Sequence, residues 1–113
     1  MKSGTRKDLF PGALELMVLQ TLKREPLHGY ALVQVIKQSS GDLLQIEEGS
    51  LYPALQRMLK EGWVKSKWTT SSSGRRIRQY AITPKGLTHL QAERKRVAQM
   101  FDGVRLVLAL VDR

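Results

Sequence analysis

Lysine and arginine side chains gather in one segment of this 113-residue chain. Residues 63–83 contain no aspartate or glutamate, and their cationic side chains are Lys65, Lys67, Arg75, Arg76 and Arg78. One-sided charge of this kind suits the sugar-phosphate backbone or the minor groove of a nucleic-acid duplex. Lysine and arginine also keep the edge of a hairpin from pairing with other molecules, and the two explanations can hold together.

A second group of candidate contact residues lies in the segment GSLYPALQRMLKEG, residues 49–62. Leu51, Leu55, Met58 and Leu59 recur at helical spacing, so we expect them on the buried side of a helix. The other side then faces solvent, with Ser50, Pro53, Ala54 and Arg57 at its centre and Tyr52, Gln56 and Lys60 beside them. A face that is merely solvated has no need of proline and alanine, so these two residues favour insertion into a groove.

The side chains of this exposed face match the chemistry of a DNA major groove. Arg57 can donate two hydrogen bonds to guanine, and Gln56 can pair with adenine. Ser50 and Tyr52 suit phosphate oxygens or base edges. A solvated helix face without any partner is the alternative interpretation.

A third candidate contact is the turn PLHGY, where His28 and Tyr30 precede a predicted helix. Free backbone N–H groups and the positive end of the helix dipole favour a phosphate oxygen there, and Tyr30 adds a phenolic donor. A glycine in a turn and a tyrosine packed on the core explain the same residues equally well. At the amino terminus Lys2, Arg6 and Lys7 can form a basic arm on the phosphates, or a frayed end.

The elements that must position these residues follow from periodicity and from turn residues. Helices are predicted from Pro11, from Ala31 to Gly41, over 50–61 with Ser50 as the amino-terminal cap and Pro53 in the first turn, and from Pro84 onward. Gly62 is the expected carboxyl-terminal stop of the third helix. Strands are predicted over 63–69 and 77–83, joined by a polar loop. The fold class is therefore mainly α with a small β-hairpin, a winged helix-turn-helix with an added carboxyl-terminal helix.

We expect one compact unit, with a winged-helix DNA-binding part and its basic arm over 1–83 and a dimerisation helix over 84–113. The helix over 84–113 has apolar residues at heptad spacing, which form a seam along one side. The first predicted helix is apolar on two sides, one more than its own core requires. The predicted dimer interface consists of Leu14, Met17, Leu87, Leu90, Val97, Phe101, Val104, Leu108 and Val111. Arg94 and Gly103 weaken the seam, and packing of this helix within its own chain is the alternative. Met17, Met100 and Phe101 form either plain core or a soft interface that opens around a small apolar effector.

Composition excludes several classes of function. The chain has no cysteine and two histidines, so disulfides, thiolate metal sites and histidine-rich metal clusters are excluded. No phosphate-binding glycine loop or catalytic constellation is present, and we expect neither an enzyme nor a cofactor. The longest apolar run, 106–111, is far too short to cross a membrane, and no secretion signal is evident. These absences, with the lack of cysteine, lead us to expect a cytoplasmic location. The net charge of +9 leads us to expect a polyanionic partner.

Three segments resemble the PadR family of bacterial transcriptional regulators: PLHGY, EEGSLYPALQRMLKEGWV and GRRIRQYAITPKG. They occur in the family order and cover roughly residues 9–91. The resemblance implies a homodimeric repressor of the short class, with the GSLYPAL helix in the major groove and the terminal helix as dimer arm. It also implies DNA contacts at Tyr30, Ser50, Tyr52 and the wing arginines. No tryptophan occurs in the terminal helix, so the flat aromatic drug site of some short members is not expected.

The sequence thus predicts a regulator that binds a palindromic operator in double-stranded DNA and is released by a small apolar ligand. The rival is a winged-helix module that binds another protein and has no specific affinity for DNA. Such a module is expected to have a neutral or acidic recognition face, which Arg57, Lys60 and the hairpin cations contradict.

Overall fold

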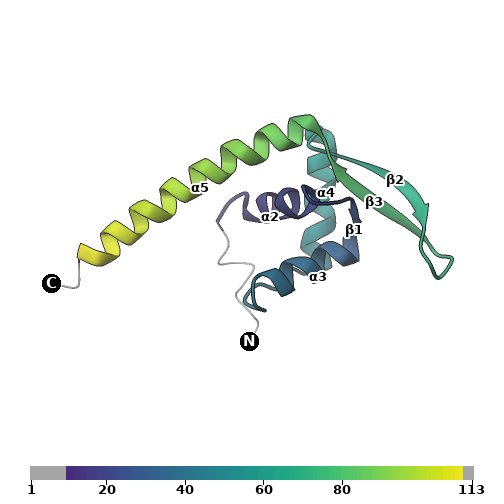
Figure 1. Ribbon diagram of the computed structural model, residues 1–113, viewed down its shortest axis with the longest axis horizontal. Coiled ribbons are helices and arrows are strands. Elements are labelled where there is room, and N and C mark those ends of the chain that lie inside the picture. The colour runs from purple at the N-terminus through teal and green to yellow at the C-terminus, as the bar shows by residue number, and fades with distance from the viewer. Residues whose placement is uncertain (1–9, 111–113) are drawn as a thin grey trace.

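The computed structural model describes residues 10–110. Along the chain the elements are α2 (Ala13–Leu22), β1 (Leu27–His28), α3 (Gly29–Ser39), α4 (Glu48–Glu61), β2 (Val64–Thr70), β3 (Arg76–Ile82) and α5 (Pro84–Leu110). In Figure 1 the first three helices form a body, the hairpin of β2 and β3 extends from one side, and α5 extends from the other. This order confirms the predicted winged helix-turn-helix with a carboxyl-terminal helix. The proposed basic arm at Lys2, Arg6 and Lys7, and Val111 of the seam, lie outside the described residues.

One hydrophobic core joins the three body helices to the base of the hairpin and to α5. Its buried side chains are Val18, Leu19, Leu22, Leu32, Ile36, Ile46, Leu51, Leu55, Met58, Val64, Tyr80 and Leu90. α2 has contacts with α3, α4, β3 and α5, so its own chain already covers much of its surface. A helix that is apolar on more than one side needs such cover, because exposed apolar area costs free energy.

α4 begins two residues earlier than its sequence suggested. The backbone carbonyl of Glu47 accepts bonds from the N–H groups of Ser50 and Leu51, so the first turn closes on Glu47. Ser50 therefore lies inside the helix, and its expected role as the cap is wrong. Pro53 falls beyond the first turn for the same reason. The carboxyl-terminal stop is confirmed, because Gly62 adopts the left-handed conformation with φ 80° that glycine tolerates best.

The wing is a three-stranded antiparallel sheet in the order β1-β3-β2. Trp68 lies opposite Arg78, and Thr70 lies opposite Arg76, in the pairing of β2 with β3. The third strand, β1, was not predicted, because two residues are too few for alternation to be visible in a sequence. Its His28 pairs with Gln79, which fastens the start of α3 to the wing.

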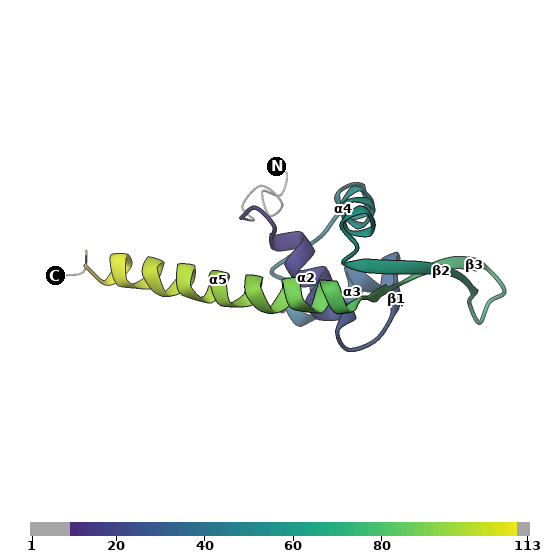
Figure 2. The same ribbon diagram turned by 90° about the horizontal axis from the view of Figure 1, so that it is seen from above.

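The first turns of α5 are fixed tightly to the body. The Thr83 hydroxyl donates to the carbonyl of Gly62 at 2.5 Å and accepts from the N–H of Gly86 at 3.0 Å. Gly86 lies so close to the Trp63 carbonyl that an added Cβ would overlap it. His89 stacks on the Trp63 ring with centroids 3.7 Å apart. Figure 2 shows the rest of α5 leaving the body as a single straight arm.

Within residues 10–110, no helix is at once long and apolar enough to span a bilayer. α5 has the necessary length, at 27 residues, but its middle carries the charged residues Glu93, Arg94, Lys95 and Arg96. The helix is therefore not apolar along its whole length.

Replacement of Gly86 by alanine is expected to lower the free energy of unfolding by about 1–3 kcal/mol, because the new methyl group overlaps backbone that cannot easily move. A Cβ added to Gly103 in the same helix would meet no atom within 4 Å beyond the adjacent helix backbone, so Gly103→Ala serves as the matched control. The control is expected to raise stability by up to about 1 kcal/mol through helix propensity. Chemical denaturation of both variants checks this, and equal behaviour of the two would contradict the close approach at Trp63.

Candidate nucleic-acid interface

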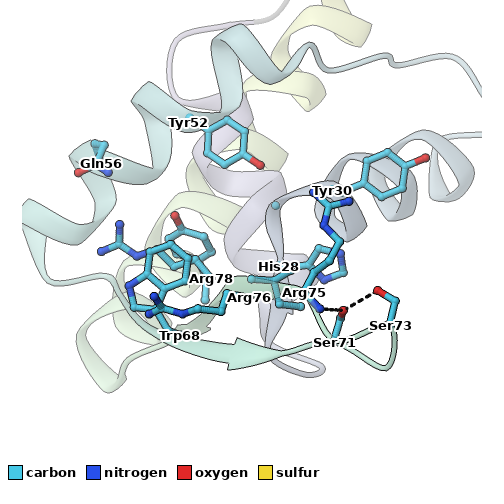
Figure 3. A pocket seen from close by; sticks show the side chains of 13 residues that line it. His28, Tyr30, Tyr52, Gln56, Trp68, Ser71, Ser73, Arg75, Arg76 and Arg78 are labelled. Carbon is cyan, nitrogen blue, oxygen red and sulfur yellow. Dashed lines mark hydrogen bonds between the residues drawn. The ribbon is translucent and has the colours of Figure 1, made fainter.

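A concavity of about 610 Å³ lies between the wing, α4 and the start of α3. Figure 3 shows the labelled side chains that surround it. The complete lining consists of His28, Gly29, Tyr30, Tyr52, Gln56, Trp68, Ser71, Ser73, Arg75, Arg76, Ile77, Arg78 and Tyr80. Residues from three separate stretches of sequence thus meet on one surface, and that surface contains three arginines and no carboxylate.

The exposed face of α4 is narrower than the sequence suggested. Ala54 was expected at its centre, but the structure buries Ala54 completely. Ala54 comes three residues after Leu51 and four before Met58, so its side chain lies on the same side of the helix as theirs. Between its two ends, where Glu48, Gly49 and Glu61 are also exposed, the exposed residues of α4 are Tyr52, Pro53, Gln56, Arg57 and Lys60. Helical spacing places Pro53, Gln56 and Lys60 along the middle of this face.

Arg57 lies on the flank of α4 that faces α2, away from the concavity. Its guanidinium donates to the carboxylate of Glu15 at 2.6 Å, and 61% of its side chain is exposed. Ser50 is half-buried on the same flank, beside Phe10 and Leu14. The sequence grouped Arg57 and Ser50 with Gln56, but the structure places them on different sides of the helix. Glu15 is far away in sequence, so no local pattern could have shown this pairing.

Tyr52 lies directly over Gly29 at the start of α3. A Cβ added to Gly29 would come within 2.5 Å of the Tyr52 hydroxyl and within 2.9 Å of the ring, so a larger residue at this position would displace the Tyr52 side chain. Burial raises the pKa of Tyr52, and the nearby Glu48 carboxylate and Tyr80 raise that pKa further. The phenol keeps its proton at neutral pH, as an ordinary tyrosine does, and so can donate a hydrogen bond to an anion.

The start of α3 presents its residues to the same concavity. His28 is the residue before the helix and is half-buried, whereas the Tyr30 side chain is 57% exposed. This exposure argues against the reading in which Tyr30 simply packs on the core. Backbone N–H groups at the beginning of a helix have no acceptor within it, so they suit an anionic oxygen.

The wing divides its cations between two faces. Successive side chains of a strand point to opposite faces, so Trp68, Arg76 and Arg78 line the concavity. Lys65 and Lys67 instead lie on the other face, beside Gln79 and Ala81. The sequence treated all five cations as one group because they are adjacent along the chain. Arg75 stays with the concave set, at a turn in which its backbone N–H donates to the Ser71 hydroxyl at 3.2 Å.

Sequence reasoning missed Trp68 as a candidate contact. Its side chain is 57% exposed on the concave face, and the Arg76 guanidinium lies 4.6 Å from the ring centroid. The available signal was strand alternation, since Trp68 shares the parity of Ser66 and Thr70 and faces the same side as its partner Arg78.

The heptad seam of α5 divides into a buried part and an exposed part. Leu90 has no exposed surface and Val97 retains 8%, so both are buried within their own chain, which corrects their assignment to a dimer interface. Leu14, Met17 and Leu87 are partly buried against that core. Toward the end of the helix the seam is open, with exposed fractions of 46% at Phe101, 50% at Val104 and 62% at Leu108. The ring of Phe10 meets Phe101 edge-on at 6.0 Å.

Comparison with known proteins agrees with this architecture. The model of the transcriptional regulator PadR-like family matches residues 18–92, which is most of the chain. The chain belongs to the PadR-like family. Members of this family are transcriptional regulators and not enzymes.

Solved structures of PadR-like proteins share the fold along most of the chain. A PadR family regulator from Eggerthella lenta is 33% identical, with a TM-score of 0.74 over 86% of this chain and 82% of that one. A PadR-like regulator from Bacillus cereus is 31% identical, with a TM-score of 0.73 over 86% and 92% of the two chains. Bacillus subtilis PadR, solved in complex with operator DNA, is 23% identical and has a TM-score of 0.63. The match covers 70% of this chain and 45% of that one. At that identity the likeness shows the fold.

The Tyr52 phenol is expected to ionise at higher pH than the ordinary value of 10.0, because its anion would be partly buried beside Glu48. Stability from the neutral phenol is therefore present below that value and is lost as pH rises through the raised pKa of the folded chain. The pKa is measured by ultraviolet titration of tyrosinate in the unmodified chain, from which the same titration of the Tyr52→Phe variant is subtracted. A normal or lowered pKa would contradict the packing of Tyr52 over Gly29.

Proposed function

We propose that this PadR-like protein binds a palindromic operator in double-stranded DNA as a homodimer and represses transcription. The observation that carries the proposal is the concave surface of α3, α4 and the wing, which gathers Arg75, Arg76 and Arg78 without any carboxylate. A surface of one charge, bordered by an exposed helix, suits the phosphates on both sides of a groove. Operator binding by a PadR of the same fold supports this proposal.

α4 supplies the part of the surface that enters the major groove. Pro53 and Gln56 present small or flat groups along its middle, which permits close approach to base edges. Gln56 pairs with adenine in this arrangement, and Lys60 reaches a guanine or a neighbouring phosphate. Arg57 contributes from the flank, and to reach a base it must exchange the Glu15 carboxylate for guanine.

Phosphate contacts on either side hold α4 in register. The start of α3 offers backbone N–H groups, His28 and the exposed Tyr30 to one strand. Tyr52 adds a protonated phenol, and the wing arginines bind the backbone beyond the groove. Lys65 and Lys67 lie on the far face of the wing, so we assign them no part in this contact.

A second copy of the chain covers the open end of α5 in this proposal. Phe101, Val104 and Leu108 lie on one side of the arm and expose about half of their surface or more, which is unfavourable for a solvated helix. A two-fold axis along this seam repeats α4 about one turn of DNA away, so the operator is palindromic. A small apolar effector would enter between the two arms, near Met100, and change their spacing.

The rival function is a winged-helix module that binds protein. The acid-free concavity disfavours it, because a protein partner would need a dense anionic surface to match three arginines. Selection of bound duplexes from a random pool decides between the two, since a protein-binding module recovers no common sequence. A recovered palindrome would also report the half-site spacing.

Removal of two concave cations is expected to weaken duplex binding and to flatten its salt dependence. Arg75→Ala with Arg76→Ala should make the negative slope of log affinity against log salt shallower by about two units, one for each lost phosphate contact. Lys65→Ala with Lys67→Ala removes the same charge from the far face and serves as the control. Affinities measured by fluorescence anisotropy at several salt concentrations provide the test. Equal loss in both double variants would mean that only net charge matters, and the assigned surface would be wrong.

Replacement of Leu108 by glutamate is expected to dissociate the dimer and to weaken operator binding, because a carboxylate would be buried in the seam. Leu106 is 74% exposed, and helical spacing puts it on the opposite side of α5. Leu106→Glu is therefore the matched control and should remain a dimer. Sedimentation velocity measures both species. A monomeric unmodified chain, or a Leu106→Glu variant that dissociates as readily, would contradict this interface.

A further inference from the structure

Trp68 is a large aromatic side chain on the solvent-exposed surface of the wing. The Trp68 side chain is 57% exposed at an exposed position of β2. The hydrophobic core therefore does not require an aromatic residue there. Its ring lies on the wall of the concavity that also holds Arg76 and Arg78 (Figure 3). An exposed indole among cations points to a role outside the hydrophobic core.

Two guanidinium groups are arranged around this one indole. The Arg76 guanidinium carbon lies 4.6 Å from the Trp68 ring centroid, and the Arg78 guanidinium carbon lies 5.8 Å from it. Arg78 also lies 6.0 Å from the ring of Tyr80, and its Nε donates to the Ser66 hydroxyl at 3.0 Å. The negative face of an aromatic ring attracts a cation at these distances.

The register of the hairpin produces this arrangement. Trp68 lies directly opposite Arg78, and Arg76 is two residues further along the same face of β3. Directly opposed and diagonal neighbours on one face of an antiparallel pair are within reach of aromatic and long side chains. No other aromatic residue occurs in β2, so Trp68 is the ring in that strand that can hold both arginines.

We propose that Trp68 is a positioning residue that holds Arg76 and Arg78 ready for the sugar-phosphate backbone of DNA. The proposal rests on the proposed function, since it assumes that the concavity receives a duplex. A free arginine loses rotamer entropy when it binds a phosphate, and stacking on the indole removes much of that loss beforehand. A guanidinium that lies on a ring keeps its N–H groups at the edge, where they can still donate to phosphate oxygens. The indole also holds two like charges close together before the phosphate arrives.

The test measures binding of a mixed-sequence DNA duplex by the full chain, because the backbone contact does not depend on base sequence. Trp68→Leu and Trp68→Thr remove the aromatic face, and Thr favours a strand, so at least one variant keeps the hairpin. Each is expected to bind about two- to fivefold more weakly than the unmodified chain, the range expected from an exposed cation–π contact. Trp68→Phe retains an aromatic face and is expected to restore most of the affinity. Thermal unfolding confirms that the variants compared are folded.

A double-mutant cycle separates positioning from a purely structural role. In a chain that already carries Arg76→Ala and Arg78→Ala, the same Trp68 substitutions are expected to cause no further loss, since nothing remains to be positioned. An additive loss would show that Trp68 acts by itself, and equal affinities of the Phe and Leu variants would show that the aromatic face is irrelevant. Either result overturns the inference while duplex binding by the unmodified chain still stands. Absence of any duplex binding by the unmodified chain would overturn the proposed function as well.

Discussion

The position of β3 between two antiparallel partners is the constraint on which the rest of the interface depends. Its pairing with β2 decides which hairpin side chains face α4, and its pairing with β1 fixes the start of α3 beside the wing. A slip of one residue in either pairing would turn the arginines to the other face and break up the concavity. Tyr80 secures the register, because it is the buried residue of β3 and lies in the common core.

Charged and uncharged side chains consequently occupy different parts of the surface. The concave face carries Arg75, Arg76 and Arg78, while Lys65 and Lys67 occupy the far face of the same sheet. Arg57 is held on the flank of α4 by Glu15, so the middle of that helix presents uncharged Gln56 and Pro53 before Lys60. A duplex on this surface would meet cations mainly at the backbone and neutral groups at the bases, which separates affinity from sequence reading.

The two ends of α5 perform different tasks. Thr83, Gly86 and His89 fix the first turns to Gly62 and Trp63, and Leu90 completes the hydrophobic core of the chain. Beyond Val97 no described residue of this helix is buried, and apart from the contact of Phe10 with Phe101 its apolar side chains receive little cover from their own chain. The seam that looks continuous in the sequence is therefore intramolecular in its first half and available to another molecule in its second half.

The sequence by itself determined the order of the helices and hairpin, the stop at Gly62, the concentration of cations in the wing and the resemblance to PadR regulators, because these depend on local periodicity and composition. Tertiary structure decided the burial of Ala54, the ion pair of Arg57 with Glu15, the short strand β1, the two faces of the wing and the burial of Leu90. Each of these depends on which element packs against which side of another. Periodicity shows that a helix or strand has sides, whereas only packing between distant segments determines what each side touches.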